Sequence, residues 1–100
     1  MNTEMSIEEF IQAVKKLSAN EHREEWIRWS SKHENATAKS VYNHLAYPEM
    51  LLWLGEAVGI DKGLIEMAES DIKQITNEHS KCAAIRKSMP WKDIERLLRG

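Results

Sequence analysis

Residues 47–61, YPEMLLWLGEAVGID, form the most apolar run of the chain. Because 42% of the residues are hydrophobic and 30% are charged, such a run has to be shielded from water, and we place it at the centre of the fold. Pro48 suits the first position of a helix, Gly59 the left-handed residue that closes it, and Asp61 the cap of the next helix. Between them MLLWL is apolar on every side, which predicts a helix buried on several faces with Trp53 in the core.

The remainder of the chain is also predicted to be helical. Glycine and proline are scarce, at four and two residues, and no segment shows the alternation of apolar and polar residues that is typical of strands. Ser6 and Glu9 form a capping box, Asn20 suits a second N-cap, and either Asn35 or Thr37 suits a third. We therefore expect an all-α fold, a compact single domain over residues 1–100 with about six or seven short helices. Their expected ranges are 7–19, 21–30, 38–45, 48–58, 62–75, 78–88 and 90–98.

Charge and cysteine content narrow the class of protein. The formal net charge of −2 argues against non-specific binding of nucleic acids, which depends on an excess of Lys and Arg. No run reaches the roughly 18–20 apolar residues that span a bilayer, and the first residues do not resemble a signal peptide. Cys82 is the single cysteine, so no intrachain disulfide can form. These features predict a soluble cytoplasmic protein with no membrane partner.

No catalytic or metal-binding motif is present. His79 and Cys82 lie three residues apart, but a closed zinc site needs further ligands and the other histidines are scattered along the sequence. Cys82 shares an apolar helix face with Ile85 and Met89, where a free cysteine usually packs as a small hydrophobic residue. We predict that the protein is not an enzyme and that it uses no metal ion and no cofactor.

Two segments carry a resemblance to known sequences. YNHLAYPEMLLWLGEAVGI, followed by CAAIRKSMPW, resembles a family of small helical accessory proteins of bacteriophages and prophages. In that family a helix–Pro–Met/Leu-rich–Trp segment precedes an AAIR-x-x-x-PW segment, and the similarity covers residues 36–98. The resemblance implies a binding protein in the cytoplasm of a bacterial host. Many such proteins counter a host defence by occupying a protein or sequestering a signalling molecule.

The segment NATAKSVY, residues 35–42, is the candidate binding motif. It predicts the start of a helix, where unpaired backbone N–H groups and the positive helix end favour a phosphate. Basic side chains further along the chain supply more donors, and an aromatic ring supplies a flat surface on which a base can stack. The alternative is that Thr37 only caps a helix, Lys39 is solvated and Trp91 belongs to the core. The predicted ligand-binding residues are Thr37, Lys39, Ser40, Tyr42, Arg86, Lys87 and Trp91.

Tryptophan usage suggests a second kind of surface. Trp26 and Trp29 lie three apart on one predicted helix, so one is expected in the core and the other partly exposed. We expect Trp29 to be the exposed one, and an exposed tryptophan is a common anchor of a protein interface. Four tryptophans and an apolar central helix also provide more apolar surface than one small core can bury. This predicts a homo-oligomer that covers the remainder.

The predicted function is therefore sequestration of a phosphate-bearing nucleotide signal. The first alternative is inhibition of a host defence protein through the Trp29 face. The second is DNA binding, because Gly55, Gly59, Asp61 and Ile65 match the spacing of a helix-turn-helix turn. Against DNA binding, the helix after that turn carries Glu66, Glu69 and Asp71, whose negative charges repel phosphates.

Overall fold

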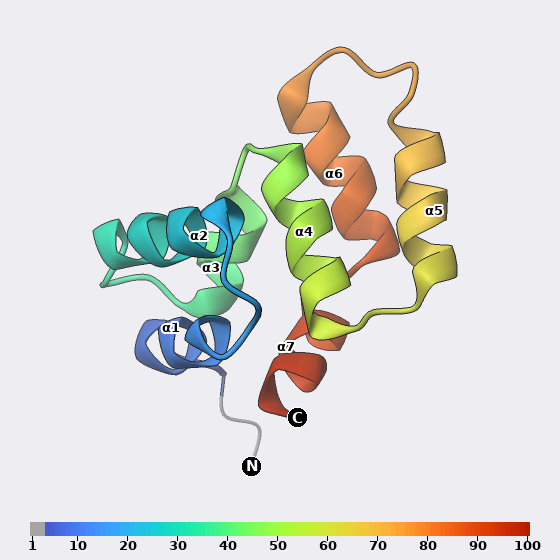
Figure 1. The fold of residues 1–100 in the computed structure, drawn as a ribbon. Coiled ribbons are helices and arrows are strands. Elements are labelled where there is room, and N and C mark those ends of the chain that lie inside the picture. The colour runs from blue at the N-terminus through green and yellow to red at the C-terminus, as the bar shows by residue number, and fades with distance from the viewer. Residues whose placement is uncertain (1–3) are drawn as a thin grey trace.

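Seven α-helices are present in residues 4–100, the part of the chain that the computed structural model describes (Figure 1). Over this range the backbone forms no strand, and Ser6 and Thr37 make one isolated antiparallel bridge. The all-α prediction is confirmed. The helices are α1 (Ile7–Lys15), α2 (Glu21–Lys32), α3 (Ala38–His44), α4 (Pro48–Val58), α5 (Lys62–Asp71), α6 (Glu78–Ser88) and α7 (Trp91–Arg99).

The helix starts follow the capping residues of the sequence. Ser6 and Glu9 form the expected capping box, and Asn20 accepts a hydrogen bond from the backbone N–H of Arg23. Of the two candidates for α3, Thr37 is the cap, since its hydroxyl accepts from the N–H of Ser40 at 3.0 Å. The cap of α5 and the first residue of α4 are also the expected Asp61 and Pro48.

Two helix ends were predicted too late in the chain. We expected α1 to reach about residue 19, but it ends at Lys15, where the N–H of Leu17 turns back to the Val14 carbonyl. Arg23 accounts for this early end, because its guanidinium donates to the carbonyls of Lys15 and Leu17 at 3.2 and 3.1 Å. Likewise α5 ends at Asp71 instead of continuing to Ile75, and residues 72–75 form turns.

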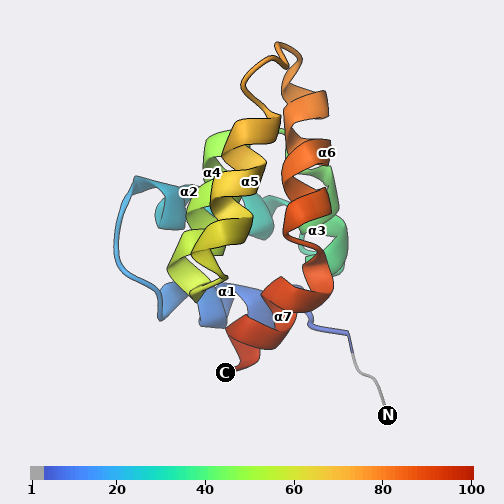
Figure 2. The ribbon, with the colours of Figure 1, turned by 90° about the vertical axis from the view of Figure 1, so that its right-hand side faces the viewer.

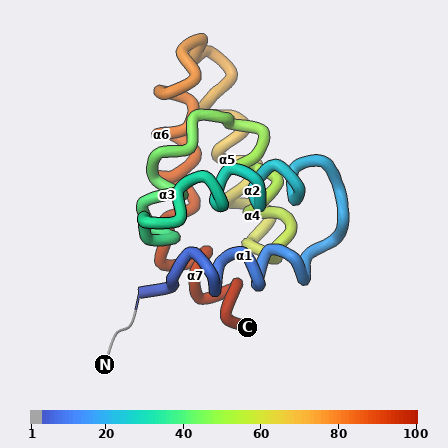
Figure 3. Tube along the Cα trace, turned by 90° about the vertical axis from the view of Figure 1, so that its left-hand side faces the viewer, coloured from blue at the N-terminus to red at the C-terminus, as the bar shows by residue number. Residues whose placement is uncertain are grey.

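Six of the helices form two groups that lie side by side (Figure 1). α1, α2 and α3 lie together on one side, as Figure 3 also shows, and α4, α5 and α6 lie on the other. α4 packs against α2, α5, α6 and α7, which makes it the central helix that its apolar sequence predicted. α5 is outermost and packs mainly against α6 (Figure 2). α7 closes the end of the domain by contacting α1, α3 and α4.

An aromatic cluster joins α1, α2, α3 and α7. The ring centroid of Trp26 lies 5.4 Å from that of Phe10, and Tyr42 lies 5.3 Å from Trp91. Trp26, Tyr42 and Phe10 are fully buried. Their polar atoms are matched, because the indole N–H of Trp26 donates to the Met50 carbonyl at 2.9 Å and the Tyr42 hydroxyl donates to that of Met89.

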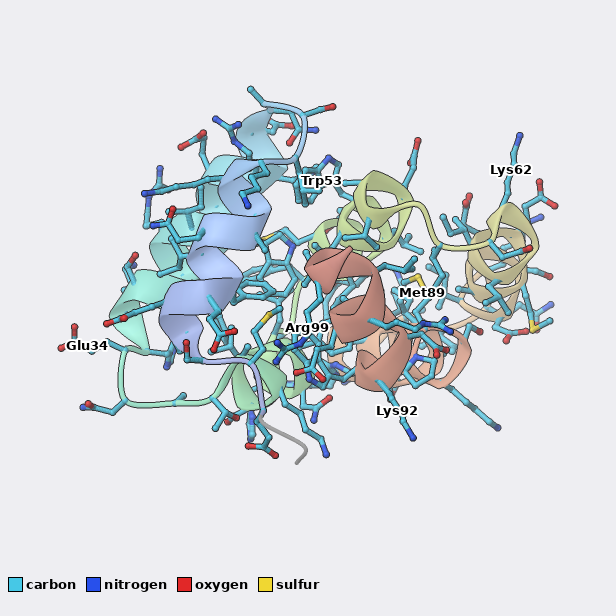
Figure 4. All side chains as sticks on the ribbon, turned by 90° about the horizontal axis from the view of Figure 1, so that it is seen from below. Glu34, Trp53, Lys62, Met89, Lys92 and Arg99 are labelled. Carbon is cyan, nitrogen blue, oxygen red and sulfur yellow. The ribbon has the colours of Figure 1, made fainter. Side chains whose placement is uncertain are left out.

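Trp53 is not the core residue that we expected. It is only partly buried and lies beside the α1–α2 connection, with its ring centroid 6.3 Å from that of His22 (Figure 4). Leu51 and Leu54 of α4 are fully buried, whereas Trp53 between them is only partly buried. Because MLLWL is apolar all round, its pattern contains no stripe that distinguishes these positions.

Few large hydrophobic side chains are exposed to solvent in the described residues. In residues 4–100 the large hydrophobic side chains with more than half of their surface exposed are Tyr47 at 54% and Met67 at 53%. The homo-oligomer stays a prediction. Cys82 is buried and unpaired, as its apolar helix face indicated. Within the same range no helix is both long and apolar enough to cross a membrane.

Candidate functional site

A surface groove of about 650 Å³ lies between α3, α6, α7 and Glu4. It brings together three of the predicted ligand-binding residues, Lys39, Arg86 and Trp91. No histidine, cysteine or hydroxyl side chain is among its lining residues in the described part of the chain. The lining residues are Glu4, Lys39, Asn43, Arg86, Pro90, Trp91, Lys92 and Glu95.

Helical spacing places the polar residues of the groove. Lys39 and Asn43 are four residues apart on α3 and so lie on one face, opposite the side that buries Val41. Lys92 and Glu95 lie three apart on α7 by the same rule. Lys92 lines the groove and its side chain extends away from the ribbon of α7 into open space (Figure 4).

Arg86 is the most constrained cation of the groove. Its Nε donates to the carbonyl of Tyr42 at 2.9 Å, one Nη donates to that of Leu45, and its Cζ lies 5.9 Å from the Tyr42 ring centroid. These carbonyls belong to the last turn of α3, whose acceptors have no partner inside the helix. Burial lowers the pKa of the Arg86 guanidinium, and its other Nη makes no hydrogen bond within residues 4–100. Arg86 thus ties α6 to α3 and retains unused N–H donors, among them both N–H groups of its other Nη.

The start of α3 is occupied by the protein itself. The N–H of Ser40 bonds to the Thr37 hydroxyl, and the N–H of Ala38 donates to the Met5 carbonyl at 3.3 Å. We expected the backbone N–H groups at this helix start to bind a phosphate. Two of them, those of Ser40 and Ala38, are instead bonded to the Thr37 hydroxyl and to the Met5 carbonyl. Thr37 and Ser40 do not line the groove, whereas Lys39 between them does.

The aromatic residues contribute less surface than the sequence suggested. Tyr42 is fully buried, and burial raises its pKa well above the ordinary range, so its ring cannot lie against a ligand in this structure. Trp91 lines the groove but is only 7% exposed, so little of its ring is open for a base to stack on. Lys87 is exposed on α6 outside the groove, and Trp29 is partly buried with its ring 4.3 Å from that of His33.

Two carboxylates oppose the cations. Glu95 is held in place, because its Oε2 accepts a hydrogen bond from the N–H of Met5 at 2.9 Å and lies 3.7 Å from Nη2 of Arg99. Glu4 is exposed at the groove edge. Three formal positive charges line the groove with two negative ones, and the Arg99 guanidinium beside Glu95 offsets part of the second negative charge, so the groove carries a net attraction for an anion.

The corner between α4 and α5 has the turn that the glycine spacing predicted. Gly59 has a φ of 84°, the left-handed region, and the N–H of Ile60 closes α4 on the Gly55 carbonyl at 3.0 Å. The following helix, α5, exposes Glu66 and Glu69. Both carboxylates would oppose the phosphates of a DNA duplex.

Comparisons with family models, with curated proteins and with solved structures find no match for this chain. Among the residues that the structure describes, no three His, Cys, Asp or Glu side chains are grouped so that they could hold a metal ion. The site is therefore defined by its own geometry.

Sequence reasoning missed part of the groove. Asn43 could have been found from Lys39, because a polar residue four positions on shares its helix face. Lys92 belongs to a basic stretch that begins at Arg86, but nothing in the sequence directs it toward α3. Glu4 and Glu95 join the site through a contact between residues 90 positions apart, Met5 and Glu95, which no local pattern encodes.

Proposed function

We propose that the protein is a non-enzymatic binding protein whose groove takes a small phosphate-bearing ligand of the nucleotide type. The observation that supports this proposal is the convergence of Lys39 from α3, Arg86 from α6 and Lys92 from α7 on one groove. Cationic nitrogen donors are the usual partners of phosphate oxygens, and hydrogen bonds between charged groups are stronger than those between neutral ones.

The other lining residues favour a nucleotide over a bare phosphate ion. The Asn43 amide can pair with a base edge, Glu4 can accept from a ribose hydroxyl or an amino group, and Pro90 with the exposed part of Trp91 gives an apolar wall. The volume of about 650 Å³ also lies within the range of small-molecule sites.

The resemblance to phage accessory proteins favours sequestration as the purpose of binding. A host that signals with nucleotides is silenced when a small, abundant protein lowers the free concentration of the signal. We propose this counter-defence role in the cytoplasm of a bacterial host. Inhibition of a host protein through Trp29 has weaker support, since that ring packs against His33.

Calorimetric titration with a panel of linear and cyclic nucleotides tests the proposal. Lys39→Ala and Lys92→Ala should each weaken binding about tenfold, because each removes a charge-assisted contact worth about 1.5–3 kcal/mol before solvent screening. Lys87→Ala is the matched control, as it removes the same charge from a residue outside the groove. Arg86→Ala is a poor probe, since it also strips the donors from two carbonyls of α3.

The absence of heat with every nucleotide would exclude the proposed ligand class. An equal loss of affinity in Lys87→Ala would show that binding depends on overall charge and not on this groove.

A further inference from the structure

The start of α3 is linked to α7 through residue 5. The N–H of Ala38 donates to the Met5 carbonyl at 3.3 Å, and the N–H of Met5 donates to Oε2 of Glu95 on α7 at 2.9 Å. Met5 is 3% exposed, so its side chain anchors this segment as well. Residue 5 therefore holds the first turn of α3, which carries Lys39, at a fixed place beside α7.

Arg99 orients the carboxylate that maintains this link. Its guanidinium lies 3.7 Å from Oε2 of Glu95 and 3.5 Å from Oε2 of Glu9 on α1 (Figure 4 labels Arg99). The other oxygen of Glu9 accepts from the N–H of Ser6 at 3.3 Å. The N–H groups of residues 5 and 6 are thus bonded to two carboxylates that pair with the same cation. Because Arg99 offsets its charge, Glu95 acts here mainly as a hydrogen-bond acceptor.

The three cations of the groove depend on this link to different degrees. Lys92 lies on the same helix as Glu95, so α7 alone sets its position. Arg86 is bonded to carbonyls at the other end of α3. Lys39 lies in the first turn of a helix of only seven residues, the turn that residue 5 holds. A loss of the link should therefore displace Lys39 before the other two.

We infer that Glu95 is a positioning residue of the groove: through Met5 it holds the first turn of α3 so that Lys39 and Lys92 can bind the same phosphate-bearing ligand. The inference rests on the proposed function of the groove. It also makes a carboxylate favourable for binding an anion, which is the opposite of what the charge of Glu95 alone predicts.

The test compares Glu95→Ala with Glu95→Gln by calorimetry on the whole chain. AMP, ADP and cyclic AMP are the probes, and the one that the parent binds most tightly is used for the variants. Both variants lose the negative charge and the ion pair with Arg99, but only glutamine keeps an oxygen that accepts from the Met5 N–H. Glu95→Ala should bind the probe about fivefold more weakly than Glu95→Gln.

Repeating this comparison in two further backgrounds separates positioning from a general loss of stability. If Glu95 acts through Lys39, the difference between alanine and glutamine should fall below about twofold in Lys39→Ala, where the contact is already absent. It should stay at about fivefold in Lys92→Ala, the matched control. A general weakening of the fold would persist in both backgrounds.

Hydrogen exchange on the parent chain gives a readout that does not depend on the folding of any variant. If the link strengthens ligand binding, ligand binding must stabilise the link by the same factor. A saturating concentration of the probe should slow exchange of the Met5 and Ala38 amides by about fivefold. The Ile60 amide, which bonds to Gly55 at the end of α4 and lies outside the groove, is the control.

The possible outcomes separate the two proposals. If Glu95→Ala and Glu95→Gln bind equally well, if their difference persists in Lys39→Ala, or if the probe leaves exchange at Met5 and Ala38 unchanged, the positioning inference is wrong while the groove remains a nucleotide site. If none of the three probes binds to the parent, both the inference and the proposed nucleotide function are overturned.

Discussion

Trp26 is the side chain on which the core depends most. It is fully buried, its ring contacts those of Phe10 and Tyr42, and its indole N–H is bonded to the Met50 carbonyl of the neighbouring helix α4. Trp26→Ala removes a large apolar volume and the hydrogen bond that the indole donates to α4. We expect it to lower the free energy of unfolding by about 3–5 kcal/mol, a large part of what a small domain has.

Trp53→Ala is the matched comparison, because it is the same substitution at a partly buried site. It should cost about 1–2 kcal/mol, since less apolar surface is lost from contact. Urea denaturation of both variants and the parent gives these values. A loss for Trp53→Ala as large as that for Trp26→Ala would contradict the burial described above.

At the scale of helices, α4 approaches the α6–α7 connection closely at Gly55. Gly55 faces Met89, and a Cβ added at Gly55 would overlap the sulfur of that fully buried side chain (Figure 4 labels Met89). Gly55→Ala improves helix propensity by about 1 kcal/mol, but overpacking a core costs about 1–3 kcal/mol. We expect a net loss of stability.

The double variant Gly55→Ala, Met89→Val checks the cause. A shorter side chain at position 89 makes room for the new methyl group, so the two substitutions together should cost less than the sum of their separate losses in urea denaturation. Additive losses would show that the two side chains do not compete for the same space.

Helix starts were more predictable than helix ends, for a physical reason. A start depends on a local pair such as Thr37 and Ser40, whose spacing is visible in the sequence. The end of α1 depends on Arg23, which belongs to the next helix and takes the carbonyls that a further turn would have used. Tertiary contacts of this kind leave no local pattern.

The candidate site shows the same division. Lys39 and Arg86 were selected as donors from their residue types and from the motif around them, and both line the groove. The hydrogen bonds that tie Arg86 to the end of α3 span 41 and 44 residues, and they change what the residue does. The sequence therefore predicted the cations of the groove. It did not predict that Arg86 links α6 to α3, or that Glu4 and Glu95 lie beside the cations.

At the scale of the whole molecule, two buried acidic groups predict how stability depends on pH. Burial raises the pKa of the Cys82 thiol, and the carboxylates of Glu78 and Glu49 raise it further, while the Arg86 guanidinium acts the other way. Burial is also the main cause of the raised pKa of Tyr42. Both groups stay neutral in the folded protein at pH values where the unfolded chain loses their protons.

The sign follows from the number of bound protons. Above about pH 9 for cysteine and pH 10 for tyrosine, the folded state holds more protons than the unfolded state, so the free energy of unfolding falls as the pH rises. Each group contributes at most about 1.4 kcal/mol per pH unit, until the pH reaches its pKa in the folded state. Below pH 8 neither group should affect the slope.

Denaturation curves between pH 7 and pH 11 check this prediction, with the slope of stability against pH as the readout. Cys82→Ala should flatten the curve from about pH 9, and Tyr42→Phe from about pH 10, even though the second variant also loses the bond to the Met89 carbonyl at every pH. Tyr47→Phe is the control, because it makes the same substitution at a tyrosine that is 54% exposed. If the parent and Tyr42→Phe lose stability in parallel above pH 10, the buried phenol does not govern the alkaline limit of the fold.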